Sequence, residues 1–449
     1  MTDTNALAII LAAGKGTRMK SALPKVLHKI AGAPLVAHVA RTAAAAGIDV
    51  ASVVVAPDMD AVGLAAKEAH PNTTTFVQRE QHGTADAVKA AEAAFAKHAG
   101  HVIVLYGDTP LLRPETLSKV RKALDTGADV VAIGFEAADP TGYGRLLMDK
   151  DGALVGIREH KDASDAEKAI TLCNSGILAF RSGGALKKLL AAIDNKNAKS
   201  EYYLTDTVAL AHADGLQARM VQSDEEEVRG VNSRSELAAA EAIIQRRLRE
   251  KAMENGASLV APETVFLSAD TVIGKDVIIE PNVVIGPGVV IEDGATIKSF
   301  CHLERAHVGP YATVGPFARL RPGAKLAKNA HVGNFVEIKQ SDIGEGAKVN
   351  HLTYIGDTSV GAAANIGAGT ITCNYDGFEK HRTEIGAGAF IGSNSSLIAP
   401  VKIGEGAYVG SGSVISKNVE PDALALTRAP QEEREGWAAK VRARRTRKK

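Results

Sequence analysis

Short apolar runs alternate with longer segments of helical pattern over roughly the first 230 residues. The apolar runs are ALAIILAAG at residues 6–14, VASVVVA at 50–56 and HVIVLYGD at 101–108. Between them lie PLVAHVARTAAAAG at 34–47 and TADAVKAAEAAFAKHA at 84–99. Steps of this kind predict an α/β domain over residues 1–232, with a mainly parallel sheet and helices on both faces. Ligands of such sheets bind at the carboxyl ends of the strands, where Gly14 and Asp108 are expected to lie.

A long helix is predicted after this domain. The segment SELAAAEAIIQRRLREKAME, from Ser235 to Glu254, consists largely of strong helix formers. Ser235 is the expected N-cap, and Asn255 with Gly256 is the expected end of the helix. Because the hydrophobic pattern differs on its two sides, we expect residues 233–254 to form a helical linker.

A six-residue repeat of aliphatic side chains characterises the C-terminal part, which we assign to residues 255–449. The repeating positions are Ile273, Ile279, Ile285, Ile291, Ile297, Leu303, Val308, Val314, Leu320, Leu326, Val332, Ile338, Ile343, Val349, Ile355, Val360, Ile366, Ile385, Ile391, Leu397, Ile403, Val409 and Ile415. Each hexad predicts a short strand and a turn with the aliphatic side chain inward, so that three hexads form one triangular coil of a parallel β-helix. Coils bury their apolar faces against each other and are stable as a stack. The repeat alone leaves open whether this prism is only a scaffold.

The repeat is interrupted at residues 371–384, whose sequence is ITCNYDGFEKHRTE. This segment is rich in polar and aromatic residues, and we predict that it forms a loop projecting from the prism. Loops held on a rigid scaffold are frequent carriers of binding groups. The interruption therefore favours a function for the prism beyond that of a scaffold.

Composition is that of a soluble protein with two domains. The chain has 449 residues, which exceeds what one hydrophobic core usually supports, and 45% of them are hydrophobic and 23% charged. A formal net charge of +1 argues against a general nucleic-acid binder. The exception is the basic tail KVRARRTRKK, from Lys440 to Lys449, which is either a solvated end or a contact for an anionic partner.

The cysteines and the N-terminus indicate the cellular compartment in which the protein is expected. Cys173, Cys301 and Cys373 are widely spaced and form no C-x-x-C pair, so they indicate neither a disulfide framework nor a zinc site. The N-terminus MTDTN carries an acid where a signal peptide has basic residues, and no apolar window reaches the length of a membrane span. We expect a cytoplasmic protein that has no membrane partner.

The loop LAAGKGTRM, at residues 11–19, follows the first predicted strand. Its glycines allow the backbone amides to approach a ligand, and its lysine and arginine suit a polyphosphate. It matches neither GxGxxG nor GxxxxGK[ST], so by itself it does not define a known phosphate-binding motif.

The motifs taken together resemble one family. The first half contains LAAGKGTRM, LPKVLH, QHGTA, YGD, GYGR, EHKDA, CNSG and VRGVN, and the second contains RPGA, VGNFVEIK, HLTYIGD and NIGAGTITCNYDG with the hexads. In this order, from about Leu7 to Trp437, they resemble the bacterial bifunctional N-acetylglucosamine-1-phosphate uridyltransferases and glucosamine-1-phosphate N-acetyltransferases. The resemblance implies a Rossmann-like nucleotidyltransferase domain, a helical arm and a left-handed parallel β-helix that forms a homotrimer. The left hand comes from the resemblance alone, because the general rule for parallel crossovers predicts a right-handed one.

For the N-terminal domain the resemblance implies uridylyl transfer from UTP to N-acetylglucosamine 1-phosphate. Clustered phosphates must be aligned and neutralised, and Lys25 and Arg18 are the implied catalytic cations. Asp108 and the Asn232 amide oxygen are the implied Mg²⁺ ligands; taken alone, Asp108 also fits a turn cap and Asn232 a helix cap. The other implied contacts are Leu11, Ala12, Ala13 and Gly14 for the nucleotide, Gln78, Gly83 and Thr84 for uracil, and Tyr106, Gly107, Gly144, Glu159 and Asn174 for the sugar. Without the resemblance, Glu159 would fit solvated surface.

For the C-terminal domain the resemblance implies acetyl transfer from acetyl-CoA to the amine of glucosamine 1-phosphate. A histidine, with a reference pKa of about 6.5, suits the removal of a proton from that amine, and His351 is the implied base. Arg321 and Lys339 are separated by 18 residues, or one coil, so their cations are expected to stack on one edge and hold a phosphate. The implied sugar contacts are Tyr354, Asn365, Asn374 and Tyr375, and the implied acetyl-CoA contacts are Ala368, Asn374, Tyr375, Ser393, Ser411 and Arg428. The family often has alanine where Ser411 stands, so that contact is expected through the backbone, and the whole site is expected between subunits.

Two other interpretations remain. The first is a sugar-1-phosphate nucleotidyltransferase whose β-helix is purely regulatory or structural; the inserted loop and the pairing of Arg321 with Lys339 argue against it. The second is a non-catalytic assembly protein with a degenerate nucleotidyltransferase domain. The presence of Lys25, Asp108 and Asn232 argues against that interpretation.

Overall fold

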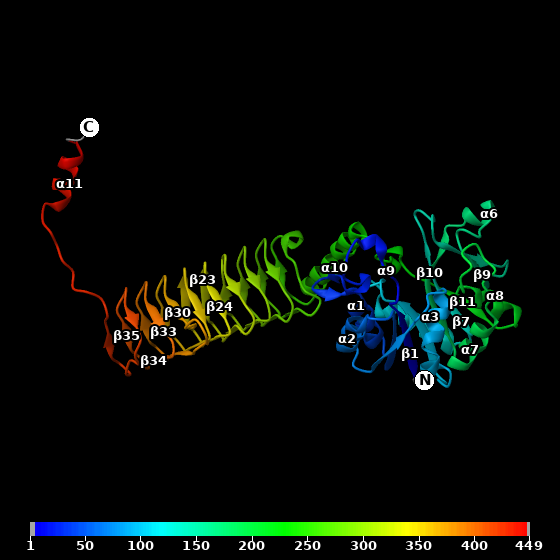
Figure 1. The fold of residues 1–449 in the computed structure, drawn as a ribbon, viewed down its shortest axis with the longest axis horizontal. Coiled ribbons are helices and arrows are strands. Elements are labelled where there is room, and N and C mark those ends of the chain that lie inside the picture. Colours follow the sequence, from blue (N-terminus) through cyan, green and yellow to red (C-terminus); the bar gives the residue numbers. More distant parts are fainter. Residues whose placement is uncertain (1–4, 447–449) are drawn as a thin grey trace. The chain divides into compact units, whose positions relative to one another are not determined.

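A computed structural model describes residues 5–446 of the chain (Figure 1). The chain divides into two compact units, with the boundary between Arg247 and Leu248. This boundary falls inside helix α10 (Arg234–Glu254). No helix of the described part of the chain is long and apolar enough to cross a membrane.

The N-terminal unit is built on one mixed sheet of nine strands. Its main path runs β11 (Ala218–Gln222), β7 (Val130–Glu136), β10 (Leu172–Phe180), β6 (His101–Tyr106), β1 (Ala6–Leu11), β4 (Val50–Val55) and β5 (Thr73–Val77). All of these strands run in one direction except β10, which is antiparallel to both neighbours. The predicted α/β fold with a mainly parallel sheet is therefore confirmed. The hairpin of β8 (Gly144–Met148) and β9 (Leu154–Arg158) is attached to β10 and was not predicted.

Helices cover both faces of this sheet. Alternate residues of β1 point to opposite sides: Ile10 enters one apolar cluster and Ile9 the other. Helices α1 (Leu35–Ala45), α2 (Asp60–Ala69) and α5 (Pro114–Asp125) contribute to the first cluster, and α3 (Thr84–Ala90), α7 (Gly183–Ala192) and α8 (Asp206–Ala213) to the second. The single helix predicted over 84–99 is wrong. The chain leaves helical geometry at Ala91, and the short α4 (Glu92–Phe95) then places Phe95 fully in the core.

The predicted long helix is confirmed as α10, but its cap is not Ser235. Ser233 caps the helix, since its hydroxyl accepts a hydrogen bond from the Glu236 amide at 3.3 Å. Glu236 in turn accepts, through its side chain, from the amide of Asn232 at 2.6 Å, so one amide of the first turn and one just before the helix are both satisfied. Gly256, at φ +102°, lies just beyond the end of the helix.

The C-terminal unit is a left-handed parallel β-helix, and Figure 1 shows its short strands stacked coil upon coil. A ten-stranded face runs from β12 (Ser258–Leu259) to β37 (Leu424–Ala425). The β13 face has eight strands from β13 (Val272–Ile273) to β34 (Val401–Ile403), and the β15 face has eight from β15 (Val284–Ile285) to β36 (Val414–Ile415). Every predicted hexad position from Ile279 to Ile415 is buried, and Ile273 is partly buried against the same core. Each such side chain stabilises the stack by about 2 kcal/mol.

The predicted interruption at 371–384 is only partly right. Strands β30 (Ile371–Cys373) and β31 (Thr383–Ile385) remain in the prism, so that residues 374–382 alone leave it. Thr372 continues the inward series although it is polar, because its hydroxyl donates a hydrogen bond to the Gly356 carbonyl at 3.2 Å inside the core. A search for aliphatic residues therefore missed one coil position.

The cysteines and the basic tail complete the fold. All three cysteines are free, and Cys173 and Cys301 are buried. Part of the basic tail belongs to helix α11 (Trp437–Thr446), whose residues are mostly exposed. Residues 447–449 of the predicted tail lie outside the described part of the chain.

Candidate active sites

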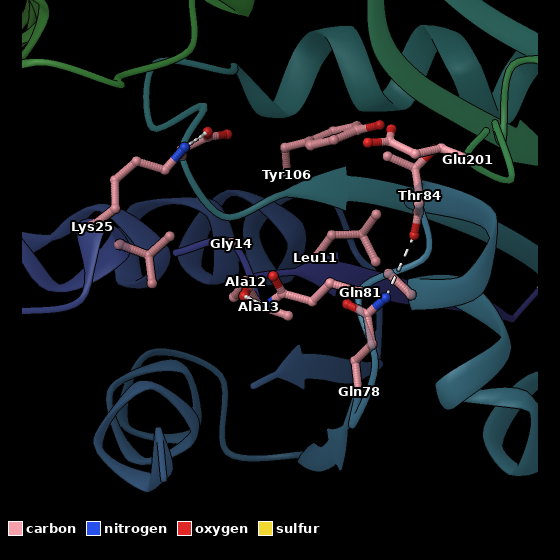
Figure 2. Close-up of a pocket in the computed structure, with 14 residues that line it drawn as sticks. Leu11, Ala12, Ala13, Gly14, Lys25, Gln78, Gln81, Thr84, Tyr106 and Glu201 are labelled. Carbon is pink, nitrogen blue, oxygen red and sulfur yellow. Dashed lines mark hydrogen bonds and ion pairs between the residues drawn. The ribbon is translucent and has the colours of Figure 1, made fainter. Parts of the chain in front are cut away.

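A cavity of about 370 Å³ opens at the carboxyl ends of β1 and β6 (Figure 2). It brings together the predicted catalytic Lys25 and metal ligand Asp108 with residues predicted as nucleotide, uracil and sugar contacts, which are Leu11, Ala12, Ala13, Gly14, Gln78, Gly83, Thr84 and Tyr106. It is also lined by Val26, Gln81, Ala87 and Glu201, which the sequence did not single out. The loops after two neighbouring parallel strands thus form one pocket, as expected at this edge of a sheet.

The glycines of the first loop have different roles. A Cβ atom on Gly14 would meet nothing within 4 Å, so the loop leaves open space for a ligand there. Gly16, at φ +60°, is required because a Cβ would lie 2.5 Å from the Cβ of Lys25. Arg18 lies in the short 3₁₀ turn Thr17–Met19 and is exposed, outside the lining of the cavity.

The Lys25 ammonium joins the two predicted metal ligands. Its Nζ contacts Asp108 Oδ2 and lies 2.9 Å from Asn232 Oδ1. A dashed line in Figure 2 marks an interaction of the labelled Lys25. The side chains of Lys25 and Asp108 are 12% and 18% exposed, so the pair is shielded from water. Two oxygens of different residues therefore converge on one cation. No cluster of three or more His, Cys, Asp or Glu side chains that could hold a metal is present among residues 5–446.

At the opposite end of the pocket, amide groups gather around the segment 78–84. The Gln78 side chain donates to Asp86 at 2.8 Å, and Gln81 donates to the Ala13 carbonyl at 2.6 Å, which ties this segment to the first loop. Gly83 has φ +125°, and a Cβ there would lie 2.5 Å from the Tyr202 carbonyl oxygen. Gln81 was missed although it belongs to the motif QHGTA, because nothing in that motif shows that it reaches the first loop.

The predicted sugar residues lie close together on the strands beside this pocket. A Cβ on Gly144 would be 3.6 Å from both Glu159 Oε1 and Asn174 Cβ. Glu159 is half-buried and accepts a hydrogen bond from the Thr205 hydroxyl at 3.2 Å. Asn174 is 6% exposed, and its Oδ1 has no hydrogen-bond partner among the described residues. A buried amide oxygen without a partner is costly unless a ligand satisfies it.

Tyr106 connects this cluster to the nucleotide pocket. Burial raises the pKa of its phenol, and the nearby carboxylates of Glu159 and Asp108 raise it further. The phenol therefore stays neutral and can donate a hydrogen bond. Gly107 packs closely under the first loop, since a Cβ there would lie 3.3 Å from the Leu11 carbonyl oxygen.

In the C-terminal unit, one group of predicted residues lies on the edge between the β15 and β13 faces, which we call the Lys339 edge. Arg321 follows β21 (Arg319–Leu320), and Lys339 ends β24 (Glu337–Lys339) one coil further on. Arg321 pairs with Glu337 at 2.8 Å, and Lys339 Nζ lies 3.2 Å from Asp357 Oδ2. The same Asp357 oxygen accepts a hydrogen bond from Asn374, which is 8% exposed.

The inserted loop adds a further cation to this edge. Contact with the Lys339 ammonium lowers the pKa of Lys380, because two like charges lie side by side. The loop is braced by Asp376, which accepts from the amides of Phe378 and Glu379 and pairs with His381 at 2.8 Å. Tyr375 is exposed, and its hydroxyl donates to the Gly377 carbonyl at 2.6 Å. Sequence reasoning missed Lys380 because nothing in the loop sequence shows that it folds back onto Lys339.

The second group lies on the edge between the ten-stranded face and the β15 face, which we call the His351 edge. His351, at the end of β26 (Lys348–His351), lies 2.6 Å from Asn334 Oδ1 through its Nδ1 atom. Ala368, Ser393 and Ser411 follow on later coils of this edge, and Arg428 donates to the Ser411 carbonyl at 2.7 Å. Arg428 thus contacts the backbone of Ser411 rather than its hydroxyl. Asn334 was missed, because only the coil register places it under His351.

The chain does not bring these two groups together. Strand β27 (Tyr354–Gly356) crosses the β15 face from the His351 edge to the Lys339 edge, and Tyr354 lies on this face between them. Asn365 lies on the ten-stranded face, in β29 (Asn365–Ile366). The implied base and the implied phosphate cations are therefore at opposite ends of one face.

Exposed aromatic rings form a column along the His351 edge. Phe300 stacks on Phe317 with ring centroids 4.8 Å apart, and Phe317 stacks on Phe335 at 5.1 Å. These three rings are 45–55% exposed and stand on corner residues with positive φ. The column, Phe300–Phe317–Phe335, leads to Leu352 beside His351.

A nucleotide-type pocket on an α/β sheet and a prism of hexapeptide coils together define a two-domain transferase. The model of the MobA-like NTP transferase domain matches residues 8–170, and that of the bacterial transferase hexapeptide (six repeats) matches residues 270–305 and 382–417. A protein of Azorhizobium caulinodans named Bifunctional protein GlmU is 57% identical over 449 residues, covering 99% of this chain and 98% of that protein. Proteins of the same name from Xanthobacter autotrophicus and Rhodospirillum rubrum are 58% and 59% identical, covering 100% and 98% of both chains in each pair. The chain belongs to this family of bifunctional GlmU proteins.

Proposed function

We propose that the chain makes UDP-N-acetylglucosamine in two steps. The C-terminal unit transfers acetyl from acetyl-CoA to glucosamine 1-phosphate, and the N-terminal unit then transfers uridylyl from UTP to N-acetylglucosamine 1-phosphate with release of pyrophosphate. The observation that carries this proposal is the presence of two separate sets of substrate-type residues, one in each unit, in a chain of the GlmU family. We propose the cytoplasm, where UTP and acetyl-CoA are made, as its location.

Uridylyl transfer requires positioning and charge neutralisation. A sugar phosphate oxygen attacks the α-phosphorus of UTP, the new P–O bond forms, and the bond to the β-phosphate oxygen breaks to release pyrophosphate. The open space at Gly14 and the amides of residues 11–14 accommodate the phosphates, and Lys25 at the same edge supplies positive charge. The unpaired oxygen of Asn174 and the Glu159 carboxylate are suited to sugar hydroxyl and amide groups.

Asp108 and Asn232 fit a divalent cation, for which we propose Mg²⁺. Their oxygens already converge on the Lys25 ammonium, so a cation between them is compatible with the arrangement. Two protein oxygens are sufficient, because Mg²⁺ keeps several waters and takes ligands from phosphates. When bound, the ion would neutralise phosphate charge and orient the triphosphate. Lys25 and the ion cannot share this position, so Lys25 would then turn to the phosphates.

Acetyl transfer requires a free amine and a held phosphate. The side-chain Oδ1 of Asn334 accepts from Nδ1–H of His351, which leaves Nε2 as the basic nitrogen. Nε2 takes a proton from the sugar amine, the amine nitrogen bonds to the thioester carbon, and the C–S bond breaks with CoA leaving as the thiolate. Arg321, Lys339 and Lys380 supply the positive charge for the sugar phosphate.

We propose that this second site is completed by another copy of the chain in a homotrimer. The base and the phosphate cations lie on different edges of one prism, so the His351 edge of one copy must meet the Lys339 edge of another. The exposed Phe300–Phe317–Phe335 column beside His351 supports this arrangement, since a partner would remove these rings from water.

The two half-reactions test the proposal when they are assayed separately. We expect Asp108→Ala to abolish uridylyl transfer and to leave acetyl transfer intact, and His351→Ala to do the reverse. Neither residue belongs to an apolar core cluster of its unit, so both variants should fold. Loss of both activities in a folded variant would contradict independent sites.

The alternative is a nucleotidyltransferase with a purely structural β-helix. It predicts no acetylation of glucosamine 1-phosphate by the parent protein at any acetyl-CoA concentration. The convergence of Lys339 and Asn374 on Asp357 argues against it, because such a polar cluster is unnecessary for stacking coils.

A further inference from the structure

Among residues 5–446, Arg145 has the largest side chain that the fold buries almost completely, with 1% of its surface exposed. Its guanidinium donates to the carbonyl oxygens of Tyr143 and Lys168, the latter at 3.1 Å, and to Nδ1 of His160 at 3.4 Å. Its Nε has no partner, and no ion pair joins it to a carboxylate among residues 5–446. A buried charge held only by neutral acceptors is costly. An apolar side chain of similar volume would suit a purely structural position at least as well.

The acceptors of Arg145 flank the proposed sugar contacts. Tyr143 directly precedes Gly144, and His160 directly follows Glu159 in a turn closed by the hydrogen bond from the Asp162 amide to the Glu159 carbonyl. On the neighbouring strand β10, Cys173 pairs with Arg145, and Asn174 pairs with Gly144. The guanidinium thus contacts the segments that carry Gly144 and Glu159, and the backbone of Arg145 pairs with the strand that carries Asn174, so Arg145 is connected to three of the five implied sugar contacts.

The other contacts of these segments make Arg145 the common anchor. Lys168 ends the short helix α6 (Asp165–Lys168), which follows the Glu159–Asp162 turn, so Arg145 holds that connection at both ends. Tyr143 packs edge-to-face on Phe135 with centroids 5.0 Å apart, and this contact fixes the segment that carries Gly144. The planar fork of an arginine sets the relative positions of several acceptors, as a lysine ammonium does not.

We propose that Arg145 is a positioning residue of the sugar-phosphate subsite, acting through Gly144, Glu159 and Asn174 without touching the substrate. The inference rests on the proposed uridylyl transfer to N-acetylglucosamine 1-phosphate. A positioning role of Arg145 predicts that its substitution changes the KM for N-acetylglucosamine 1-phosphate but not the KM for UTP. The nucleotide contacts belong to the loops after β1 and β6 and to residues 78–84, none of which Arg145 contacts.

Steady-state kinetics of the full-length protein test this role. In Arg145→Met we expect the KM for N-acetylglucosamine 1-phosphate to rise by about tenfold or more, because small displacements of positioning groups have large effects. The KM for UTP should change by less than about twofold, and Arg145→Lys should recover part of the loss. Arg158→Met is the matched control: Arg158 pairs with Arg145 across the β8–β9 hairpin, but it is 48% exposed and bonds to Glu167 at the surface.

An unchanged KM for UTP shows that the N-terminal unit is folded, and acetyl transfer by the same samples reports on the C-terminal unit. If Arg145→Met does not fold, His160→Ala removes one acceptor from a half-buried position and should raise the same KM by a smaller factor. Equal increases in both KM values, or a lower kcat with both KM values unchanged, would overturn the positioning role. Absence of uridylyl transfer in the parent would overturn the proposed function instead.

Discussion

The two candidate sites differ in how completely one chain builds them. At the edge of the N-terminal sheet, loops from separate strands surround a cavity, so that Gly14, Lys25 and Gln78 face one space. On the prism, His351 and Lys339 lie at opposite ends of a flat face. A twisted sheet with helices can enclose a ligand, whereas a straight stack of coils offers only edges and faces. A site on such a prism needs either an inserted loop or a second prism, and this chain has the loop and the exposed column that a partner would cover.

The largest expected effect comes from separating the prisms. Phe317→Glu places a charge in the middle of the Phe300–Phe317–Phe335 column, and we expect it to dissociate the proposed trimer and to lower acetyl transfer by at least about tenfold. Uridylyl transfer should remain near the parental rate. Sedimentation measures the oligomeric state of the variant, and the two assays on the same sample measure its acetyl transfer and uridylyl transfer.

Tyr311→Glu is the matched control for that change. Tyr311 is also an exposed aromatic residue with positive φ at a prism corner, but it lies between the β13 and ten-stranded faces. A trimeric Phe317→Glu variant without acetyl transfer would argue that the column binds substrate rather than a partner.

A smaller effect is expected inside the N-terminal pocket, where Lys25 competes with the proposed metal. Removal of the ammonium in Lys25→Met leaves Asp108 uncompensated, so Mn²⁺ should bind the nucleotide-free protein about tenfold more tightly, as measured by electron paramagnetic resonance. Uridylyl transfer should nevertheless fall, because Lys25 no longer reaches the phosphates.

Lys29→Met changes the net charge equally at an exposed position and should leave Mn²⁺ binding unchanged. Asp108→Asn should weaken binding. Unchanged Mn²⁺ affinity in Lys25→Met, together with weaker binding in Asp108→Asn, would support the proposed metal site but contradict competition between Lys25 and the metal.

The smallest effect concerns the pH dependence of stability in the N-terminal unit. Burial, and then the charges of Asp194 and Glu159, raise the pKa of Asp206 from 3.8 to about 6. The folded state therefore favours the protonated carboxyl, and its contribution to stability is present at low pH and is lost as the pH rises through about 6. Asp206→Asn should be more stable than the parent near neutral pH, with the difference fading below about pH 4, as followed by urea unfolding. The exposed Asp151→Asn is the control, and a difference that does not vary with pH would contradict this origin.

The features that depend on the local repeat of apolar residues could be predicted from the sequence. The hexad aliphatics are buried because a six-residue repeat leaves them only one side of a coil, and Gly14 and Asp108 lie at one edge because parallel strands end there. The N-terminal cap of α10 was assigned to Ser235 rather than Ser233, because serines two residues apart give the same signal. Thr372 was not recognised as an inward residue, because its hydroxyl is satisfied by backbone groups of the previous coil, which the sequence does not show.

Contacts that depend on register between distant segments were not predictable. Asn334 lies beneath His351 only because of the coil length between them, and Lys380 meets Lys339 only because the inserted loop folds back. The antiparallel direction of β10 is also absent from its apolar pattern, yet it brings Asn174 opposite Gly144. The identities of the proposed site residues came from the resemblance, and the way they are supported came from the structure.

Mixing two inactive variants tests most directly whether the second site belongs to two chains. His351→Ala lacks the base and Lys339→Ala lacks a phosphate cation, and each should be inactive in acetyl transfer when alone. Co-expressed in equal amounts, they should assemble trimers with about a quarter of the parental acetyl transfer, because that fraction of sites pairs an intact His351 edge with an intact Lys339 edge. Activity no higher than that of either variant alone would place both residues in a site of one chain and contradict the account.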